Sequence, residues 1–103
     1  MNSVLDRAHF DHMTGADRAL QAELIGLFRM QVDGWRAALA QTQGWREAVH
    51  TLKGSARGIG LHALAAACEA AEAGSDDARA LAQVLTALEQ ALGALEELAG
   101  NTD

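Results

Sequence analysis

The longest regular pattern of apolar and polar positions in the chain runs from Arg18 to about Ala40. Its apolar residues recur at steps of three and four, the spacing of one face of an amphipathic α-helix. They are Leu20, Leu24, Leu27, Phe28, Trp35 and Leu39. Ile25 and Val32 lie at one edge of this stripe, so they could cover the N-terminal segment or remain partly exposed. We favour a third interpretation, in which they pack in the core. Asp17 precedes the pattern and is a suitable N-cap.

A second helix is predicted from Trp45 to Leu61, where an apolar stripe lies opposite a polar flank at about 100° per residue. The stripe consists of Trp45, Ala48, Val49, Leu52, Ala56 and Ile59. The polar flank consists of Arg46, His50, Lys53, Gly54 and Arg57. Residues 41–44 form a short polar connection before this helix, of the length that joins antiparallel neighbours.

Two further helices follow the glycines at positions 58 and 60, which bend the chain. The first is predicted over residues 62–73, with Leu64, Cys68 and Ala71 facing inward. Residues 74–77 end it and cap the last helix, which runs to about Ala99. The leucine seam of the last helix comprises Leu81, Val84, Leu85, Leu88, Leu92, Leu95 and Leu98.

The pattern at the N-terminus is shorter. Residues 3–13 form a segment or helix whose apolar side chains cover one end of the bundle, and residues 14–17 break it. Those side chains are Val4, Leu5, Phe10 and Met13.

Four amphipathic helices with short connections can bury their apolar faces in one core. We therefore predict an all-α fold, an antiparallel up-down four-helix bundle with a short N-terminal capping segment or helix. The 103 residues are enough for one domain. Residues 1–16 form its cap, 17–99 its bundle and 100–103 a frayed tail.

Composition agrees with a helical protein, because half of the residues are hydrophobic and proline and tyrosine are absent. Neither an apolar run of about 18 residues nor a secretory N-terminus is present, so we expect a cytoplasmic protein without a membrane span. The net charge of −6 argues against nucleic acid as the main partner. Residues 43–62 nevertheless carry +2, leaving −8 on the remainder, and this local basic patch indicates a local anion.

The polar flank of the second helix carries the candidate chemistry. His50 lies one helical turn from Lys53 and Gly54, at the spacings where helix side chains are neighbours. Imidazole is a competent nucleophile near neutral pH, and a lysine ammonium suits an incoming phosphoryl group as a compact charge. Lys53 is the single lysine of the chain, and a glycine inside a helix costs about 1 kcal/mol relative to alanine. These are the parts that a phosphorylated histidine needs.

Other reactive side chains give weaker signals. His9 and His12 have a spacing that can place two metal ligands on one helix face, but no further ligand completes a site, and we predict no metal. We expect His62 to be a solvated residue at a helix start. Cys68 is alone, so it cannot form an internal disulfide, and we interpret it as a small buried hydrophobe.

The segment His50-Thr51-Leu52-Lys53-Gly54-Ser55-Ala56, followed by Gly58-Ile59-Gly60-Leu61, resembles the signature of histidine-containing phosphotransfer (HPt) domains. The resemblance covers nearly the whole chain. It extends to Leu64, Cys68, Glu69 and Glu72, where the family often shows a leucine-cysteine-glutamate pattern. Ala71 is smaller than the leucine usual nearby.

The resemblance implies the intermediate of a multistep phosphorelay. His50 would accept a phosphoryl group from a receiver-domain aspartate and pass it to another, with Lys53 beside it. Arg46, Gly54, Ser55 and Arg57 are the residues expected to meet the partner. The expected partners are a hybrid sensor histidine kinase and response-regulator receiver domains, which would supply Mg²⁺, and the chain would be a monomer without a cofactor or kinase activity of its own.

Two alternatives remain open at this stage. In a helical interaction module without phosphotransfer, Gly54 would serve a helix-helix crossing and His50 would be incidental. In an enzyme, the chain would be a histidine phosphatase or the phosphotransfer part of a histidine kinase. A kinase would require an ATP-binding domain with a glycine-rich lid, which these residues do not supply.

Overall fold

The computed structural model describes residues 4–41, 44–74 and 77–100, and within these ranges all regular structure is helical. The helices are α1 (Arg7–Thr14), α2 (Arg18–Leu39), α3 (Trp45–Ile59), α4 (His62–Ala73) and α5 (Asp77–Gly100). The predicted all-α fold is therefore confirmed. The predicted end of the last helix and start of the tail differ slightly, because α5 includes Gly100, whereas residues 101–103 lie outside the described ranges.

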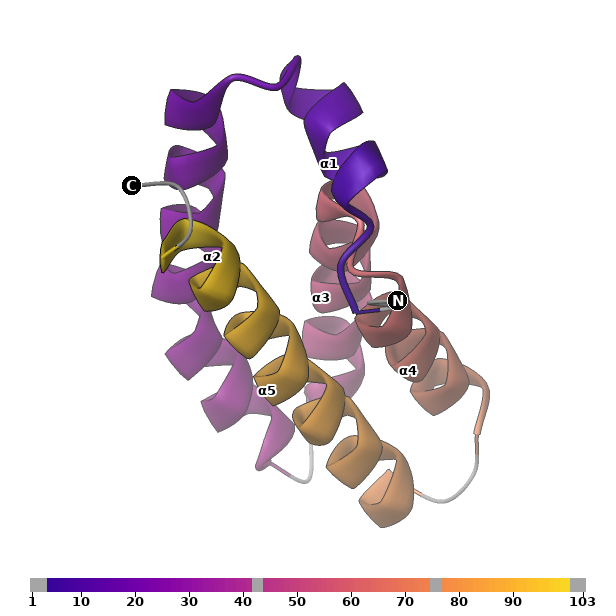
Figure 1. The fold of residues 1–103 in the computed structure, drawn as a ribbon. Coiled ribbons are helices and arrows are strands. Elements are labelled where there is room, and N and C mark those ends of the chain that lie inside the picture. Colours follow the sequence, from indigo (N-terminus) through magenta and orange to yellow (C-terminus); the bar gives the residue numbers. More distant parts are fainter. Residues whose placement is uncertain (1–3, 42–43, 75–76, 101–103) are drawn as a thin grey trace.

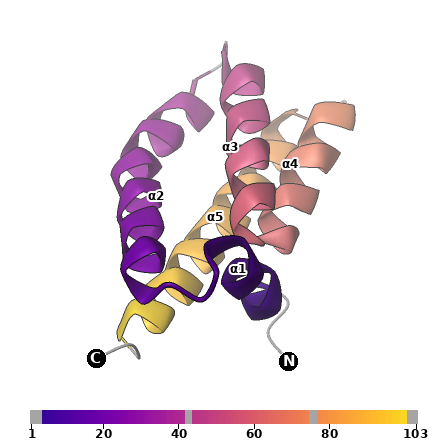
Figure 2. The same cartoon turned by 90° about the horizontal axis from the view of Figure 1, so that it is seen from above.

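Helices α2 to α5 form the bundle, with each helix packed against two neighbours around a common core (Figure 1). Contacts join α2 to α3, α3 to α4, α4 to α5, and α5 back to α2. The short helix α1 packs against α2 and α3 at one end of the bundle (Figure 2). The N-terminal cap expected from the sequence is thus a helix. None of the described helices is long and apolar enough to cross a membrane.

The helix boundaries have local causes. Asp17 caps α2, because its carboxylate accepts a hydrogen bond of 3.1 Å from the Leu20 amide. Asp6 caps α1 in the same way, accepting from the His9 amide at 3.0 Å. Gly60 ends α3 with φ of 97°, a left-handed conformation that favours glycine, and the following amide of Leu61 also bonds to the Ala56 carbonyl. The sharp α3–α4 turn places the two helices side by side.

The core draws on all five helices and follows the predicted stripes on α3, α4 and α5. It contains Leu5, Phe10, Ile25, Phe28, Val32, Trp35, Leu39, Trp45, Val49, Leu52, Ala56, Leu61, Leu64, Ala65, Cys68, Ala71, Val84, Leu88, Ala91, Leu95 and Leu98. On α2 the stripe is shifted relative to the prediction. The favoured core packing of Ile25 and Val32 is confirmed, because they are 4% and 2% exposed. Leu20 and Leu27 of the predicted stripe are instead 37% and 52% exposed.

This shift has a tertiary cause. Helix α2 packs against α3 and α5 together, so the side chains that face the space between those two helices are buried. Met13, which was also expected to cover the capped end, is 51% exposed.

Polar contacts fasten the helices at the bundle surface and at its capped end. Arg36 of α2 forms a bidentate ion pair with Glu89 of α5, with N–O distances of 2.6 and 2.7 Å. Buried Gln21 of α2 donates to Asp11 and Thr14 of α1, at 2.9 Å each. A buried amide that is satisfied in this way fixes the position of α1 on α2.

Candidate functional site

Helix α3 separates a buried face from the face that carries the candidate histidine. Val49, Leu52 and Ala56 are fully buried, and they hold the helix against its neighbours. The His50 side chain, on the other face, is 72% exposed. The backbone of α3 is thus fixed by packing while the imidazole projects from the surface, as the helical periodicity predicts.

A carboxylate from α4 connects His50 and Lys53. One oxygen of Glu72 lies 3.2 Å from His50 Nδ1, and its other oxygen lies 2.5 Å from Lys53 Nζ. The side chains of Lys53 and Glu72 are 16% and 29% exposed, so both are less exposed than His50. The pKa of Glu72 is held below its usual value, first by the lysine ammonium and then by the imidazole, against a partial desolvation that raises it.

The position of Lys53 corrects one expectation. The helical wheel placed Lys53 on the solvated flank, free to meet an anion, but the structure buries most of its side chain and pairs it with Glu72. Periodicity within α3 carries no information about α4, so this ion pair was not expected. The sequence did contain a signal for this contact. Leu61 lies at the turn between the two helices, and His50 precedes it by as many residues as Glu72 follows it.

The small residues of α3 leave part of the histidine face bare. A β-carbon built on Gly54 or on Gly58 would find no other atom within 4 Å, apart from its own helix. Among the described helices, none therefore packs against Gly54 closely enough to require a glycine there. The absence of side chains at these two positions leaves this part of the helix surface open.

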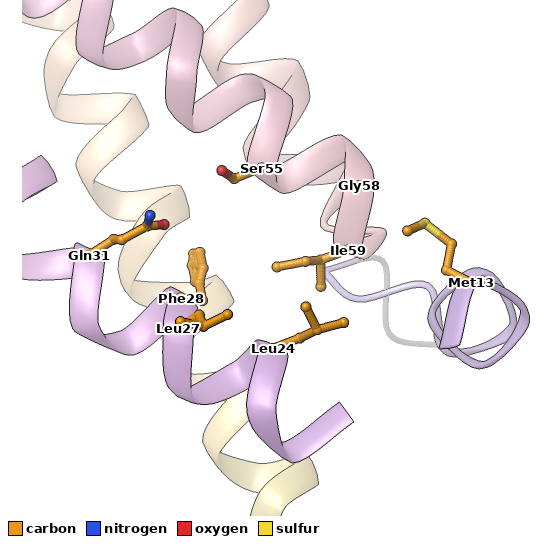
Figure 3. Close-up of a pocket in the computed structure, with 8 residues that line it drawn as sticks. All are labelled: Met13, Leu24, Leu27, Phe28, Gln31, Ser55, Gly58 and Ile59. Atoms are coloured by element: carbon orange, nitrogen blue, oxygen red, sulfur yellow. The ribbon is translucent and has the colours of Figure 1, made fainter. Parts of the chain in front are cut away.

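A hollow of about 290 Å³ adjoins this bare surface, between α2 and α3 and beside α1 (Figure 3). Figure 3 shows Leu24 and Phe28 of α2 directed toward α3, with Ile59 between the helices and Met13 approaching from α1. Its complete lining is Met13, Leu24, Leu27, Phe28, Gln31, Ser55, Gly58 and Ile59. Leu27 and Met13, which the sequence analysis expected to be covered and which are 52% and 51% exposed, thus line one concave surface.

The basic residues of α3 lie on the opposite side of His50, next to α4. The Arg46 guanidinium stacks over the Trp45 ring at 4.3 Å and approaches the Glu72 carbonyl at 3.4 Å. Arg57 is paired with Glu69 at 3.0 Å. The residues expected to meet a partner are thus divided. Ser55 lines the hollow and Gly54 leaves bare helix surface, whereas the two arginines contact α4.

The remaining candidates have structural roles. His62 Nε2 lies 3.1 Å from Asp6, and its ring meets that of His9 edge to face, with 5.7 Å between centroids. Over residues 4–41, 44–74 and 77–100, no cluster of three or more His, Cys, Asp or Glu side chains is arranged to hold a metal ion. Cys68 is buried as predicted, and desolvation raises the pKa of its thiol to about 11, which suppresses the reactive thiolate.

This fold and site define a class of protein. It is a helical bundle in which one helix presents an exposed histidine and a neighbouring lysine, beside a glycine that leaves the helix surface bare. The chain belongs to the Hpt domain family, which its residues 9–98 match. It is also similar to a solved structure, the histidine phosphotransferase ShpA from Caulobacter crescentus, with 38% sequence identity and a TM-score of 0.86. That similarity covers 95% of this chain and 92% of the ShpA chain. The comparison with curated proteins gives no match.

Family membership gives the protein a phosphotransfer role in a phosphorelay, in agreement with the resemblance seen in the sequence. It disfavours the alternative of an interaction module without phosphotransfer.

Proposed function

We propose that His50 is the residue that carries the phosphoryl group between receiver-domain aspartates. The observation that supports this assignment is the exposed imidazole of His50 on an otherwise rigid helix, with Glu72 at Nδ1 and bare helix surface at Gly54. Among the described residues, Nε2 of the ring has no hydrogen-bond partner, so it is the nitrogen available to a phosphoryl donor.

The transfer is an in-line displacement at phosphorus. The lone pair of His50 Nε2 forms the new N–P bond, while the P–O bond of the aspartyl phosphate breaks and its electron pair leaves on the carboxylate. Alignment and neutralisation of charge are the main requirements of such a step. Lys53 lies one turn from His50 and supplies positive charge. The receiver domain supplies the acidic pocket and Mg²⁺, and this chain catalyses no phosphorylation from ATP.

The receiver domain docks across the bare surface of α3 and over the apolar hollow beside α2. The hollow supports this placement because it joins Ser55 and Gly58 to exposed apolar side chains of α1 and α2. The arginines on the α4 side are engaged with α4 or with Trp45, so they contribute less than the sequence suggested. A monomer suffices for this function, with hybrid sensor kinases and response regulators as sources of the receiver domains.

Substitution of the histidine tests the assignment. His50→Gln is expected to abolish acid-labile, base-stable labelling by a phosphorylated receiver domain, with a free energy of unfolding within about 0.5 kcal/mol of the wild type because the side chain is exposed. His12→Gln, which changes another exposed histidine, should be labelled normally. Labelling of His50→Gln would place the phosphoryl group elsewhere. Hydrolysis of ATP by the pure protein would contradict the carrier assignment.

A further inference from the structure

We propose that Met13 is an oxidation site on the receiver-docking surface, and that conversion of its thioether to a sulfoxide weakens receiver binding without unfolding the protein. The inference rests on the proposed docking of a receiver domain over the hollow between α2 and α3. It goes further, because it assigns a chemical modification to α1 and makes phosphotransfer sensitive to peroxides.

The sulfur atoms of the described residues differ in their access to solvent. The chain has one cysteine and three methionines, of which Met1 lies outside the described ranges. Cys68 is fully buried, and the pKa of its thiol is raised to about 11, so little reactive thiolate forms near neutral pH. The side chains of Met13 and Met30 are 51% and 80% exposed. An oxidant in solution therefore reaches these two thioethers more readily than the thiol.

The two exposed methionines have different surroundings. Met13 belongs to α1 and lines the hollow, and Figure 3 shows its side chain directed toward Gly58 and Ile59 of α3. Met30 belongs to α2, and the hollow is lined by other residues of that helix. A partner side chain that packs into the hollow would therefore contact the thioether of Met13. Met30 provides an internal comparison, because it is even more exposed to an oxidant but lies outside the hollow.

Helix α1 holds Met13 at the hollow through contacts that do not involve its sulfur. Phe10 is buried in the core, and Asp11 and Thr14 each accept a hydrogen bond of 2.9 Å from the buried amide of Gln21 on α2. The backbone on both sides of Met13 is therefore fixed by these anchors. Oxidation should leave α1 in place, because it alters a half-exposed side chain and none of the anchoring groups.

The oxidant in this proposal is a peroxide. A lone pair of the Met13 sulfur attacks one peroxide oxygen, the S–O bond forms, the O–O bond breaks, and the other oxygen leaves as water after proton transfer. The sulfur loses two electrons and the peroxide is reduced. A methionine sulfoxide reductase reverses the change with two thiols, which become a disulfide while the sulfoxide oxygen leaves as water. The modification is thus chemically reversible.

A sulfoxide at this position is a poor match for an apolar contact. Its oxygen is a strong hydrogen-bond acceptor, whereas Met13 faces apolar groups of α3. The polar side chains of the lining, Gln31 and Ser55, lie on the side of the hollow away from Met13 (Figure 3). A receiver that covers the hollow would therefore bury the sulfoxide without a partner from this lining, and burial of an unsatisfied polar group opposes binding.

The test compares each protein with itself before and after oxidation, for the wild type, Met13→Leu and Met30→Leu. The isolated protein is treated with hydrogen peroxide, which is removed with catalase before a receiver domain is added. Peptide mass spectrometry measures the oxygen added at each sulfur, and circular dichroism checks the fold. Titration with the unphosphorylated receiver gives the dissociation constant. Because the result is the ratio of two constants for one protein, any effect of the substitution itself cancels.

The dissociation constants of the wild type and of Met30→Leu are expected to rise about tenfold on oxidation, with unchanged helicity. The constant of Met13→Leu should not change, because its remaining methionines are outside the hollow or outside the described residues. Treatment of the oxidised wild type with methionine sulfoxide reductase should restore binding. Met13→Gln, whose amide imitates the polarity of a sulfoxide, should bind more weakly than Met13→Leu before any oxidation.

Three results would overturn the inference. The first is wild-type protein with oxidised Met13 that binds the receiver as tightly as the reduced form. The second is an equal loss of binding in oxidised Met13→Leu, which would place the sensitive group elsewhere. The third is Met13 that stays reduced while Met30 is oxidised. In each case a phosphorylated receiver would still label His50. Failure of the proposed carrier function would look different, because His50→Gln would then retain its label.

Discussion

At the scale of single residues, Lys53 combines two properties that a phosphoryl carrier needs. Its side chain is mostly buried, which restricts its motion, and its ammonium is held by Glu72 one turn from His50. A compact ammonium can shift between a carboxylate and a nearby phosphoryl group without the planar geometry that a guanidinium demands. We therefore propose an electrostatic role for Lys53, which does not require contact with the body of the partner.

Lys53→Ala is expected to slow transfer to His50 by at least about tenfold and to leave receiver affinity largely unchanged. The reason is that the variant removes a charge beside the phosphoryl group and not an exposed docking surface. Single-turnover transfer and a binding titration measure the two effects. Arg29→Ala, which breaks the ion pair of α2 with Glu96, is the control. If Lys53→Ala transferred the phosphoryl group at the wild-type rate, Lys53 would have only a structural role.

Gly54→Ala should stabilise the isolated protein by about 0.5–1 kcal/mol, because alanine is the better helix former and its β-carbon meets no other atom. Transfer should fall nonetheless, and Gly54→Leu should weaken receiver binding severely without unfolding the bundle. Gly93→Ala is the matched control, since a β-carbon there is also unobstructed. It should be stabilised to a similar extent and transfer normally. A destabilised Gly54→Ala protein that transfers normally would contradict the docking role.

At the scale of elements, the α3–α4 hairpin creates the site. The turn at Gly60 and Leu61 brings the face of α4 that carries Glu72 beside the face of α3 that carries His50 and Lys53. Helix α2 has a separate role, because it forms the second wall of the hollow. Its position depends on its own N-cap and on its packing against α3 and α5.

Asp17→Ala is expected to lower the free energy of unfolding by about 1 kcal/mol, because it removes the side-chain acceptor of the Leu20 amide at the start of α2. Urea denaturation measures the change. Glu23→Ala removes an exposed acidic residue from the same helix and should stay within about 0.5 kcal/mol of the wild type. Equal stability of the two variants would show that the cap contributes nothing. The folded fraction of Asp17→Ala should still accept phosphate on His50.

At the scale of the whole molecule, three carboxylates of the described residues connect separate elements and have lowered pKa values. The pKa of Glu72 is lowered chiefly by Lys53, that of Glu89 by Arg36, and that of Asp6 by its hydrogen bond from the His9 amide and then by His62. Each carboxylate binds its proton more weakly in the folded state than in the unfolded state. Their stabilising contributions are therefore complete above the unfolded pKa values of about 4 and are lost as the pH falls through the folded values.

The melting temperature should consequently be nearly constant near neutral pH and should decrease as the pH is lowered below about 5. Thermal denaturation between neutral pH and about pH 3 measures this slope. Glu89→Gln should lower the melting temperature at neutral pH and flatten the acid slope, because it removes one of the three groups. A Glu89→Gln slope equal to that of the wild type would show that the Arg36 ion pair does not contribute.

The sequence by itself determined the helices and the spacing of the candidate site. Helical periodicity specified α2 to α5 to within a few residues, because apolar side chains at steps of three and four can be buried together only on a helix. It also placed His50, Lys53 and Gly54 one turn apart, since positions within a helix have a fixed angular relation. The resemblance of that segment to a phosphotransfer signature then indicated the family.

Only the tertiary structure decided which contacts those residues make. Periodicity did not distinguish the neighbouring stripes of α2, and packing against two helices buried Ile25 and left Leu27 exposed in the hollow. In the same way, Lys53 was expected to be free and is paired with Glu72, a residue distant in sequence. The physical reason is that a local pattern relates positions within one helix, whereas the partner of a side chain depends on which face of another helix packs against it.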